Sequence, residues 1–132
     1  MTEFTGQLTE LMPFAGTLGI EVDKTTAEEV AGRLAWAPQL CTSGGVLHGG
    51  VLMALADTLG GACAFFNLPA GATTSTIESK TNFFRPITAG HVRAVTRPLH
   101  VGRSTIVVQT DLYDDGDRRV AQVTQTQAVR RA

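Results

Sequence analysis

The pattern of apolar residues is densest from Val51 to Phe66, where nearly every residue is apolar or small and Asp57 is the only ionisable side chain. A pair of glycines precedes this stretch and a Leu-Pro-Ala-Gly sequence follows it. Such flanks are typical of the beginning and end of a helix. The pattern therefore predicts one long helix, from His48 or Gly49 to about Asn67, with a carboxylate in apolar surroundings.

The rest of the chain mostly alternates between apolar and polar positions, which is typical of strands with one buried face. The predicted strands are Leu18–Lys24, Val30–Trp36, Thr73–Phe84, His91–Leu99, Ser104–Tyr113 and Arg119–Arg130. Before them, apolar residues at helical spacing from Phe4 to Phe14 predict a short N-terminal helix that Pro13 ends. An Asp-Asp-Gly-Asp sequence at 114–117 predicts a tight turn before the last strand.

The strands at 73–84 and 119–130 differ in how clearly alternation assigns their faces. On the first, Thr76, Glu78, Lys80 and Asn82 are predicted to share one face. The second is rich in Thr and Gln, so its buried face stays open. One helix and about six strands, mostly joined by hairpins, can be packed by wrapping a curved antiparallel sheet around the helix, which predicts an α+β fold.

Composition narrows the class of protein. With 132 residues, the chain is predicted to be a single domain (1–132) that is large enough to bury a core. Its 43% hydrophobic and 17% charged residues suit a compact soluble protein. The net charge is −1 and no Lys/Arg cluster occurs, so a nucleic-acid partner is not expected.

The sequence also argues against a metalloprotein, a secreted protein and a membrane protein. Cys41 and Cys63 fit neither a disulfide framework nor a metal site, and His91 and His100 are scattered, so we expect no metal. No charged and then apolar leader opens the sequence, which predicts a cytoplasmic protein. Asp57 would cost about 3 kcal/mol at the centre of a membrane helix, so we expect no membrane span.

The glycines after His48 give the predicted helix N-terminus amides without a side-chain screen or an intrahelical partner. Helped by the helix dipole, such amides can hold a carbonyl oxygen as it gains negative charge. Asp57 follows Gly49 by eight residues, which is about 12 Å along one helix. One carbonyl cannot contact both groups, so a joint role requires two antiparallel helices across a two-fold axis, and hence a homodimer.

The run from Gly45 to Asp57, His-Gly-Gly with an acidic residue nine positions after the histidine, resembles the hotdog-fold acyl-CoA thioesterases. The similarity is to the phenylacetyl-CoA and 4-hydroxybenzoyl-CoA thioesterase branch, and it extends to Leu18-Gly19-Ile20, Glu78–Pro86 and Gly102-Arg103. It covers about Phe14 to Val129. The resemblance implies a hotdog fold and a homodimer or dimer-of-dimers tetramer. It also implies hydrolysis of aryl or short- to medium-chain acyl-CoA to free acid and CoA, without a cofactor.

The resemblance implies roles for individual residues as well. Asp57 would be a general base or a nucleophile, the Gly49 amide would polarise the thioester carbonyl, and His48 would position the substrate or structure the loop. Thr42 lies where many relatives carry Asn or Gln to orient water, and Thr76 where relatives place Ser or Thr near that water. Substrate contacts are expected at Gly50, Phe83, Phe84, Arg85, Pro86, Val101, Gly102 and Arg103, with the arginines near the CoA phosphates.

Other interpretations stay open at this point. Asp57 could be structural, bonded to a neighbouring backbone group or an arginine, and Thr76 could serve β-propensity alone. A hotdog dehydratase would need a catalytic histidine paired with a carboxylate of the partner chain, in a setting that differs from that of His48. A non-catalytic module that binds or senses acyl-CoA is a third class. Asp57 argues against it, whereas Thr42 in place of Asn or Gln argues for it.

Overall fold

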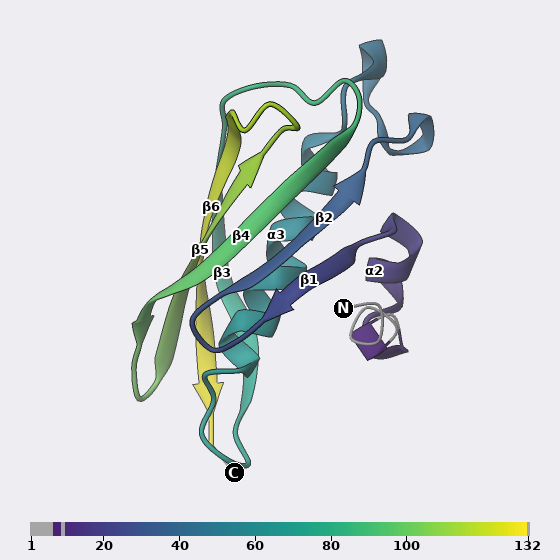
Figure 1. Cartoon of the computed structure of the whole chain (residues 1–132). Coiled ribbons are helices and arrows are strands. Elements are labelled where there is room, and N and C mark those ends of the chain that lie inside the picture. Colours follow the sequence, from purple (N-terminus) through teal and green to yellow (C-terminus); the bar gives the residue numbers. More distant parts are fainter. Residues whose placement is uncertain (1–6, 9, 132) are drawn as a thin grey trace.

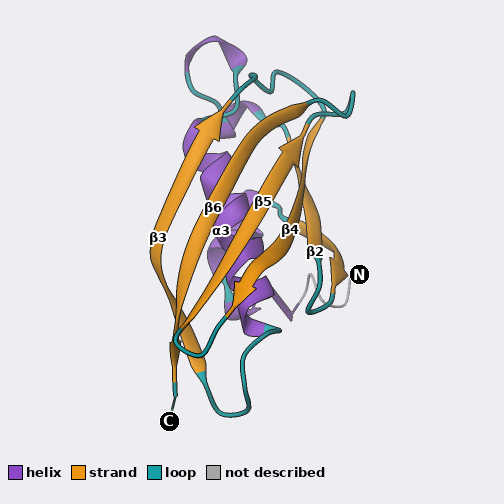
Figure 2. Cartoon of the chain, turned by 90° about the vertical axis from the view of Figure 1, so that its left-hand side faces the viewer, coloured by secondary structure: helices purple, strands orange, loops and turns teal. Residues whose placement is uncertain are grey.

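The computed structural model describes residues 7–8 and 10–131 and has a six-stranded antiparallel sheet wrapped around one long helix (Figure 1). The strand order is β1-β2-β4-β5-β6-β3. The strands are β1 (Glu21–Thr25), β2 (Val30–Ala35), β3 (Thr73–Phe83), β4 (His91–Val101), β5 (Thr105–Tyr113) and β6 (Arg119–Arg130). The predicted α+β arrangement is confirmed, and Figure 2 shows the sheet lying across the helix with β3 at one edge.

The central helix α3 (Gly49–Phe65) is capped by side chains at both ends. At its start, His48 Nδ1 accepts a hydrogen bond from the Gly50 amide at 2.8 Å. Beyond its end, the Asn67 side-chain amide donates to the Cys63 carbonyl at 2.9 Å and to a carbonyl of the β1–β2 turn at 2.8 Å. The helix therefore stops two residues before the predicted end, because the Asn67 side chain satisfies a terminal carbonyl.

One face of α3 packs against the concave side of the sheet, where Leu55, Leu59 and Cys63 are fully buried. The sheet contributes Val30, Leu34, Val92, Ala94, Ile106, Val108, Leu112 and Val123 to this core. Burial raises the pKa of the Cys63 thiol to about 11, so this cysteine stays protonated and unreactive near neutral pH. Within the described part of the chain, no helix has the length and apolar character needed to span a bilayer.

The N-terminal region differs from its prediction. The helix predicted for Phe4–Phe14 lies partly outside the described residues, and within them the helical conformation is interrupted at Met12. Pro13 then begins α2 (Pro13–Leu18), because proline at the first helical position sacrifices no intrahelical hydrogen bond. Gly19 ends α2 in the left-handed conformation (φ 76°), so β1 starts three residues later than predicted.

A β-bulge in β3 changes the predicted assignment of its faces. Thr76 pairs with Gln127 and Glu78 pairs with Thr126, which leaves Ile77 as the extra residue. The prediction that Thr76 shares a face with Glu78, Lys80 and Asn82 is therefore wrong. Because the bulge inserts one residue into the alternation, Thr76 instead shares the inward face with Ser79, Thr81 and Phe83.

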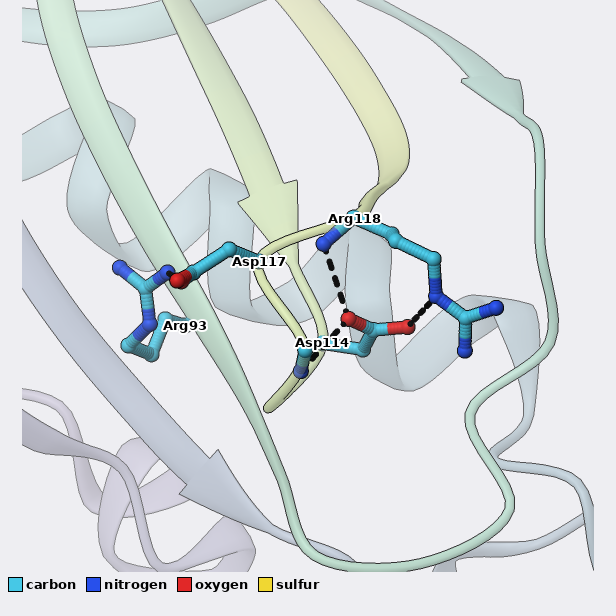
Figure 3. Close-up of polar contacts among 5 residues, drawn as sticks. Arg93, Asp114, Asp117 and Arg118 are labelled. Atoms are coloured by element: carbon cyan, nitrogen blue, oxygen red, sulfur yellow. Dashed lines mark hydrogen bonds and ion pairs between the residues drawn. The ribbon is translucent and has the colours of Figure 1, made fainter.

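The turn between β5 and β6 is organised by Asp114, in agreement with the Asp-Asp-Gly-Asp prediction (Figure 3). Its Oδ1 accepts hydrogen bonds from the Gly116 and Arg118 amides, each at 2.9 Å, and its Oδ2 accepts one from Arg118 Nε at 2.9 Å. These bonds, above all that from the Arg118 amide, lower the pKa of Asp114. Asp117 forms an ion pair with Arg93, so the turn is also tied to β4.

Candidate active site

The first turn of α3 has one available backbone donor in its pair of glycines. The Gly50 amide is bonded to His48 Nδ1 at 2.8 Å, whereas the Gly49 amide has no acceptor among the residues that the structure describes. Since Nδ1 accepts a hydrogen bond, the proton of the neutral His48 ring lies on Nε2, which can donate as well. The helix dipole adds to the Gly49 donor, so this end of α3 favours an oxygen that carries negative charge.

A cavity of about 360 Å³ opens beside Gly49. Its wall contains six of the predicted site residues, namely Thr42, Gly49, Phe83, Phe84, Arg85 and Pro86. A Cβ atom on Gly49 would lie only 3.0 Å from Phe83 Cζ, so a glycine at this position lets the aromatic ring lie against the start of the helix. The fold thus places the His-Gly-Gly segment in contact with the end of β3.

Asp57 lies on an exposed face of α3 and not in the apolar surroundings that its sequence neighbours predict. Its Oδ1 accepts a hydrogen bond from Gln125 Nε2 at 2.7 Å and a longer one from the Thr76 hydroxyl at 3.4 Å. Among the described residues these neutral donors are its only hydrogen-bonding or ionic partners. The carboxylate borders a cavity of about 300 Å³ that Met53 and Ser79 also line.

Gln125 belongs to a chain of hydrogen bonds that ends at Asp57. Gln125 and Gln127 lie on β6 and are each only 1% exposed. Gln127 Nε2 donates to Gln125 Oε1 at 2.9 Å and to Thr76 Oγ1 at 2.8 Å, and Gln127 Oε1 accepts from the Thr74 hydroxyl at 3.1 Å. Both buried amides therefore have partners at nitrogen and oxygen, and the chain directs Gln125 Nε2 toward the carboxylate.

The sequence-based prediction of the site missed Gln125 and Gln127. The two glutamines are two residues apart, so they share one face of the last strand. Because they alternate with threonines, however, the sequence does not show which face is buried. The glycine at position 60, inside a helix, was a second sequence feature that could have indicated a close neighbour. A Cβ atom at Gly60 would lie 2.4 Å from Gln125 Oε1. A glycine in the middle of α3 thus leaves the space that the Gln125 side chain occupies.

Three predicted substrate contacts lie elsewhere in the chain. Val101, Gly102 and Arg103 are at the turn between β4 and β5, at the end of the sheet opposite the start of α3 (Figure 1). The Arg103 carbonyl accepts a hydrogen bond from Arg131 at 3.2 Å, near the end of the chain. A single chain therefore does not bring Arg103 to the cavity that contains Arg85. The described residues also include no group of three or more His, Cys, Asp and Glu side chains placed to hold a metal ion.

The sequence of the chain matches a known family over most of the site. A model of the thioesterase superfamily matches residues 44–121, and the chain belongs to this family. The matched region contains Gly49, Asp57 and Thr76 but ends before Gln125 and Gln127. Fold and family together define the chain as a hotdog-fold thioester hydrolase.

Individual relatives agree with this class. ComA2 of Bacillus subtilis, named as a candidate esterase, is 34% identical over 105 residues, which cover 78% of this chain and 82% of ComA2. The proofreading thioesterase EntH of Klebsiella pneumoniae is 37% identical over 75 residues, covering 57% of this chain and 55% of EntH. The crystal structure of thioesterase HI1161 from Haemophilus influenzae is similar with a TM-score of 0.87 at 28% identity, covering 95% of this chain and 89% of HI1161.

Proposed function

We propose that this thioester hydrolase cleaves acyl-CoA thioesters to a free acid and CoA, with Asp57 as the catalytic carboxylate. The observation that carries the proposal is the environment of Asp57. Neutral donors from Thr76 and Gln125 hold Oδ1, while Oδ2 has no donor among the described residues. A carboxylate that neutral donors hold at one oxygen, and whose other oxygen is available beside a cavity, can act on a substrate.

The oxyanion donor in this proposal is the Gly49 amide of a second copy of the chain. Within one chain, Gly49 and Asp57 lie about 12 Å apart along α3, which is too far for one thioester carbonyl. An edge strand supports self-association, because β3 is the last strand of the sheet and exposes Ile77 and Phe83, and Phe84 is exposed directly after it. A two-fold axis that sets two α3 helices antiparallel would create two equivalent composite sites, and such dimers could pair into a tetramer.

Two reaction paths are compatible with this arrangement. As a general base, Asp57 Oδ2 takes a proton from water as the water oxygen attacks the thioester carbon, and the C–S bond then breaks while the proton passes from Asp57 to the departing CoA thiolate. As a nucleophile, Oδ2 attacks the same carbon and expels the CoA thiolate, and water then hydrolyses the mixed anhydride. In both paths the Gly49 N–H holds the oxyanion, and Gln125 acts as a positioning residue that keeps Oδ1 in place.

The cavity beside Gly49 would bind the CoA side of the substrate. The segment from Phe83 to Pro86 supplies apolar surface for the pantetheine arm, and the Arg85 guanidinium can pair with a CoA phosphate. Thr42 in the same cavity and the His48 Nε2–H supply further hydrogen-bonding groups near the thioester. In this proposal, Val101, Gly102 and Arg103 would contact CoA only across a subunit interface.

The test is the release of free thiol from aryl, short-chain and medium-chain acyl-CoA. We expect turnover by the wild-type protein and a loss on the order of 10²–10⁴-fold in Asp57→Asn, because the substitution removes the base or nucleophile. Asp23→Asn is the control, since Asp23 is an exposed carboxylate on β1 that pairs with Arg33 at 3.4 Å. Full turnover by Asp57→Asn would refute the assignment, and acyl-CoA binding without any thiol release would favour a non-catalytic module.

A further inference from the structure

The segment 42–46, here called the glycine loop, forms part of the wall of the proposed CoA cavity. Thr42 and Val46 line that cavity, and the Thr42 amide donates to the Val46 carbonyl at 2.8 Å, which closes the segment into a loop. Between them, Gly44 (φ 81°) and Gly45 (φ 74°) are in the left-handed conformation. A Cβ atom on either glycine would have no described neighbour within 4 Å, so the space around both positions is open.

Trp36, directly after β2, holds the glycine loop from outside. Its indole Nε1–H donates to the Gly45 carbonyl at 2.9 Å. Among the described residues, no other hydrogen bond connects residues 42–46 with the rest of the chain. The ring is half-buried and packs against the hydrophobic core. It is therefore a fixed support for a segment whose two glycines have great conformational freedom.

The backbone around Trp36 connects the glycine loop with a second part of the same wall, the segment 83–87. The Trp36 amide donates to the Gly90 carbonyl at 2.8 Å, three residues beyond that segment. The Leu47 amide, next to the glycine loop, donates to the Ile87 carbonyl at 2.9 Å. Trp36 thus bonds to the glycine loop through its side chain and to the chain after the second segment through its backbone.

We propose that Trp36 is a positioning residue for CoA binding, whose N–H holds the glycine loop where Thr42 and Val46 contact the CoA arm. The inference rests on the proposed binding of CoA in this cavity and adds a residue that lies outside its wall. One hydrogen bond to a backbone carbonyl typically shifts an equilibrium about fivefold. Without this bond, the glycines let the loop leave its position, and only the molecules that keep it bind CoA with full affinity.

The first experiment removes the donor and compares a complete with a truncated substrate. In Trp36→Phe, we expect KM for the best acyl-CoA substrate to rise about two- to fivefold, with kcat within about twofold of the wild type. The same acyl group on N-acetylcysteamine, which lacks most of the CoA arm, should show an unchanged kcat/KM. Benzothienylalanine at position 36 has sulfur in place of the ring N–H, so it should reproduce the rise in KM while keeping the shape of the ring.

A variant of the glycine loop tests the same position independently. Gly44→Ala places a Cβ atom on a residue with a φ of 81°, which disfavours the observed loop conformation and should also raise KM for acyl-CoA. The rise in the double variant with Trp36→Phe should be smaller than the product of the two single effects, because both act on one loop.

Thr26→Val is the control for a merely structural role. The Thr26 hydroxyl donates to the Glu29 carbonyl and accepts from the Glu29 amide, each at 3.0 Å, within the β1–β2 turn. This variant should lower the Tm without changing KM. If Trp36→Phe likewise lowers only the Tm, or if it affects acyl-CoA and the N-acetylcysteamine thioester equally, Trp36 does not position the loop for CoA.

Trp36 is the only tryptophan of the chain, so its fluorescence reports on the loop without a label. Titration with CoA should change the emission along a curve that gives the same Kd as calorimetry, and Gly44→Ala should weaken both. CoA binding without a change in emission, or no CoA binding, would overturn the proposal.

The positioning of CoA by Trp36 and the proposed hydrolysis at Asp57 can fail separately. If Asp57→Asn is inactive and Trp36→Phe has unchanged kinetics on every substrate, the positioning role is wrong and the hydrolysis stands. If no thioester is hydrolysed, the CoA titration alone decides about Trp36. CoA binding that changes the emission and that the benzothienylalanine variant weakens by calorimetry would then support the positioning role, whereas equal binding by the two proteins would refute it.

Discussion

The start of α3 and the middle of the same helix differ in where their chemistry comes from. At the start, His48, Gly49 and Gly50 are contiguous, and one local hydrogen bond decides which amide remains available. In the middle, Asp57 depends on partners from β3 and β6, which lie far from it in the sequence. Contiguous residues at the start of a helix keep the same spatial arrangement in any fold. Residues on separate strands, by contrast, meet only when the sheet has its native register.

This difference also decides how each region can be tested. The donor at Gly49 is a backbone amide, so substitution cannot remove it and can only obstruct the space around it. The support of Asp57 consists of side chains that can be changed one atom group at a time. The largest change in activity is therefore expected when the Gly49 region is blocked in one chain and Asp57 is changed in a second chain.

The first prediction combines two inactive variants. Gly49→Val places a branched side chain where even a Cβ atom lies 3.0 Å from Phe83, and Asp57→Asn removes the carboxylate. Each alone should retain less than about 1% of wild-type activity. Co-expression under two affinity tags should restore about a quarter of it, because half of randomly formed dimers are mixed and each mixed dimer has one intact composite site.

Purified mixed dimers, verified by mass, decide the outcome. Inactive mixed dimers would show that Gly49 and Asp57 serve the same chain or different functions. Two preparations of the same variant under the two tags are the matched control, and their mixed dimers should stay inactive. A fully active monomer would contradict the composite site directly.

The second prediction concerns the support of Asp57. Gln125→Met keeps the length of the side chain and removes the donor to Oδ1, so kcat should fall about 10- to 100-fold while KM stays within about twofold. Gln122→Met is a matched control, because Gln122 on the same strand donates to Asp111 Oδ1 at 2.9 Å. If both variants lose the same activity, or if KM carries the whole effect in Gln125→Met, Gln125 is not a positioning residue.

The smallest effect is expected at the β5–β6 turn (Figure 3), none of whose residues belongs to the proposed site. Hydrogen bonds, above all that from the Arg118 amide, lower the pKa of Asp114 in the folded state. Its contribution to stability is therefore complete above the unfolded-state pKa, which is about 4, and is lost as the pH falls through the lower folded-state value. In Asp114→Asn, we expect a slightly lower Tm at neutral pH and a flatter decline of Tm below about pH 5.

Thermal unfolding at a series of pH values checks this prediction, with thiol release at neutral pH as the second readout. Activity should be unchanged, because the side-chain hydrogen bonds of Asp114 among the described residues all stay within its own turn. Asp115→Asn in the same turn is the control, since the Asp115 carboxylate is bonded to His91 on β4, through its amide at 3.2 Å and its ring Nδ1 at 3.9 Å, and lacks the hydrogen bonds with Gly116 and Arg118 that Asp114 forms. If the Tm of Asp114→Asn fell at acid pH as steeply as that of the wild type, the lowered pKa of Asp114 would not explain the loss of stability.

Much of the fold follows from local patterns. The long helix, the six strands and the Asp-Asp-Gly-Asp turn are confirmed within a few residues, because helical periodicity, alternation and turn chemistry act over short distances. Pro13 was predicted only to end a helix, whereas in the structure it also begins α2, since proline suits a first helical position as well as a stop. The order of the strands came only from the resemblance to a family, as periodicity carries no information about neighbours in a sheet.

Of the candidate site, the sequence by itself determined the glycine pair, the lone carboxylate eight residues after Gly49, and the segment that follows β3. Only the tertiary structure decided that the bulge at Ile77 returns Thr76 to the inward face and that Gln125 meets Asp57. It also decided that Arg103 lies at the far end of the sheet. The reason is physical: spacing along the chain sets which side chains share a face, but packing between strands and helix sets which face is buried and what it meets.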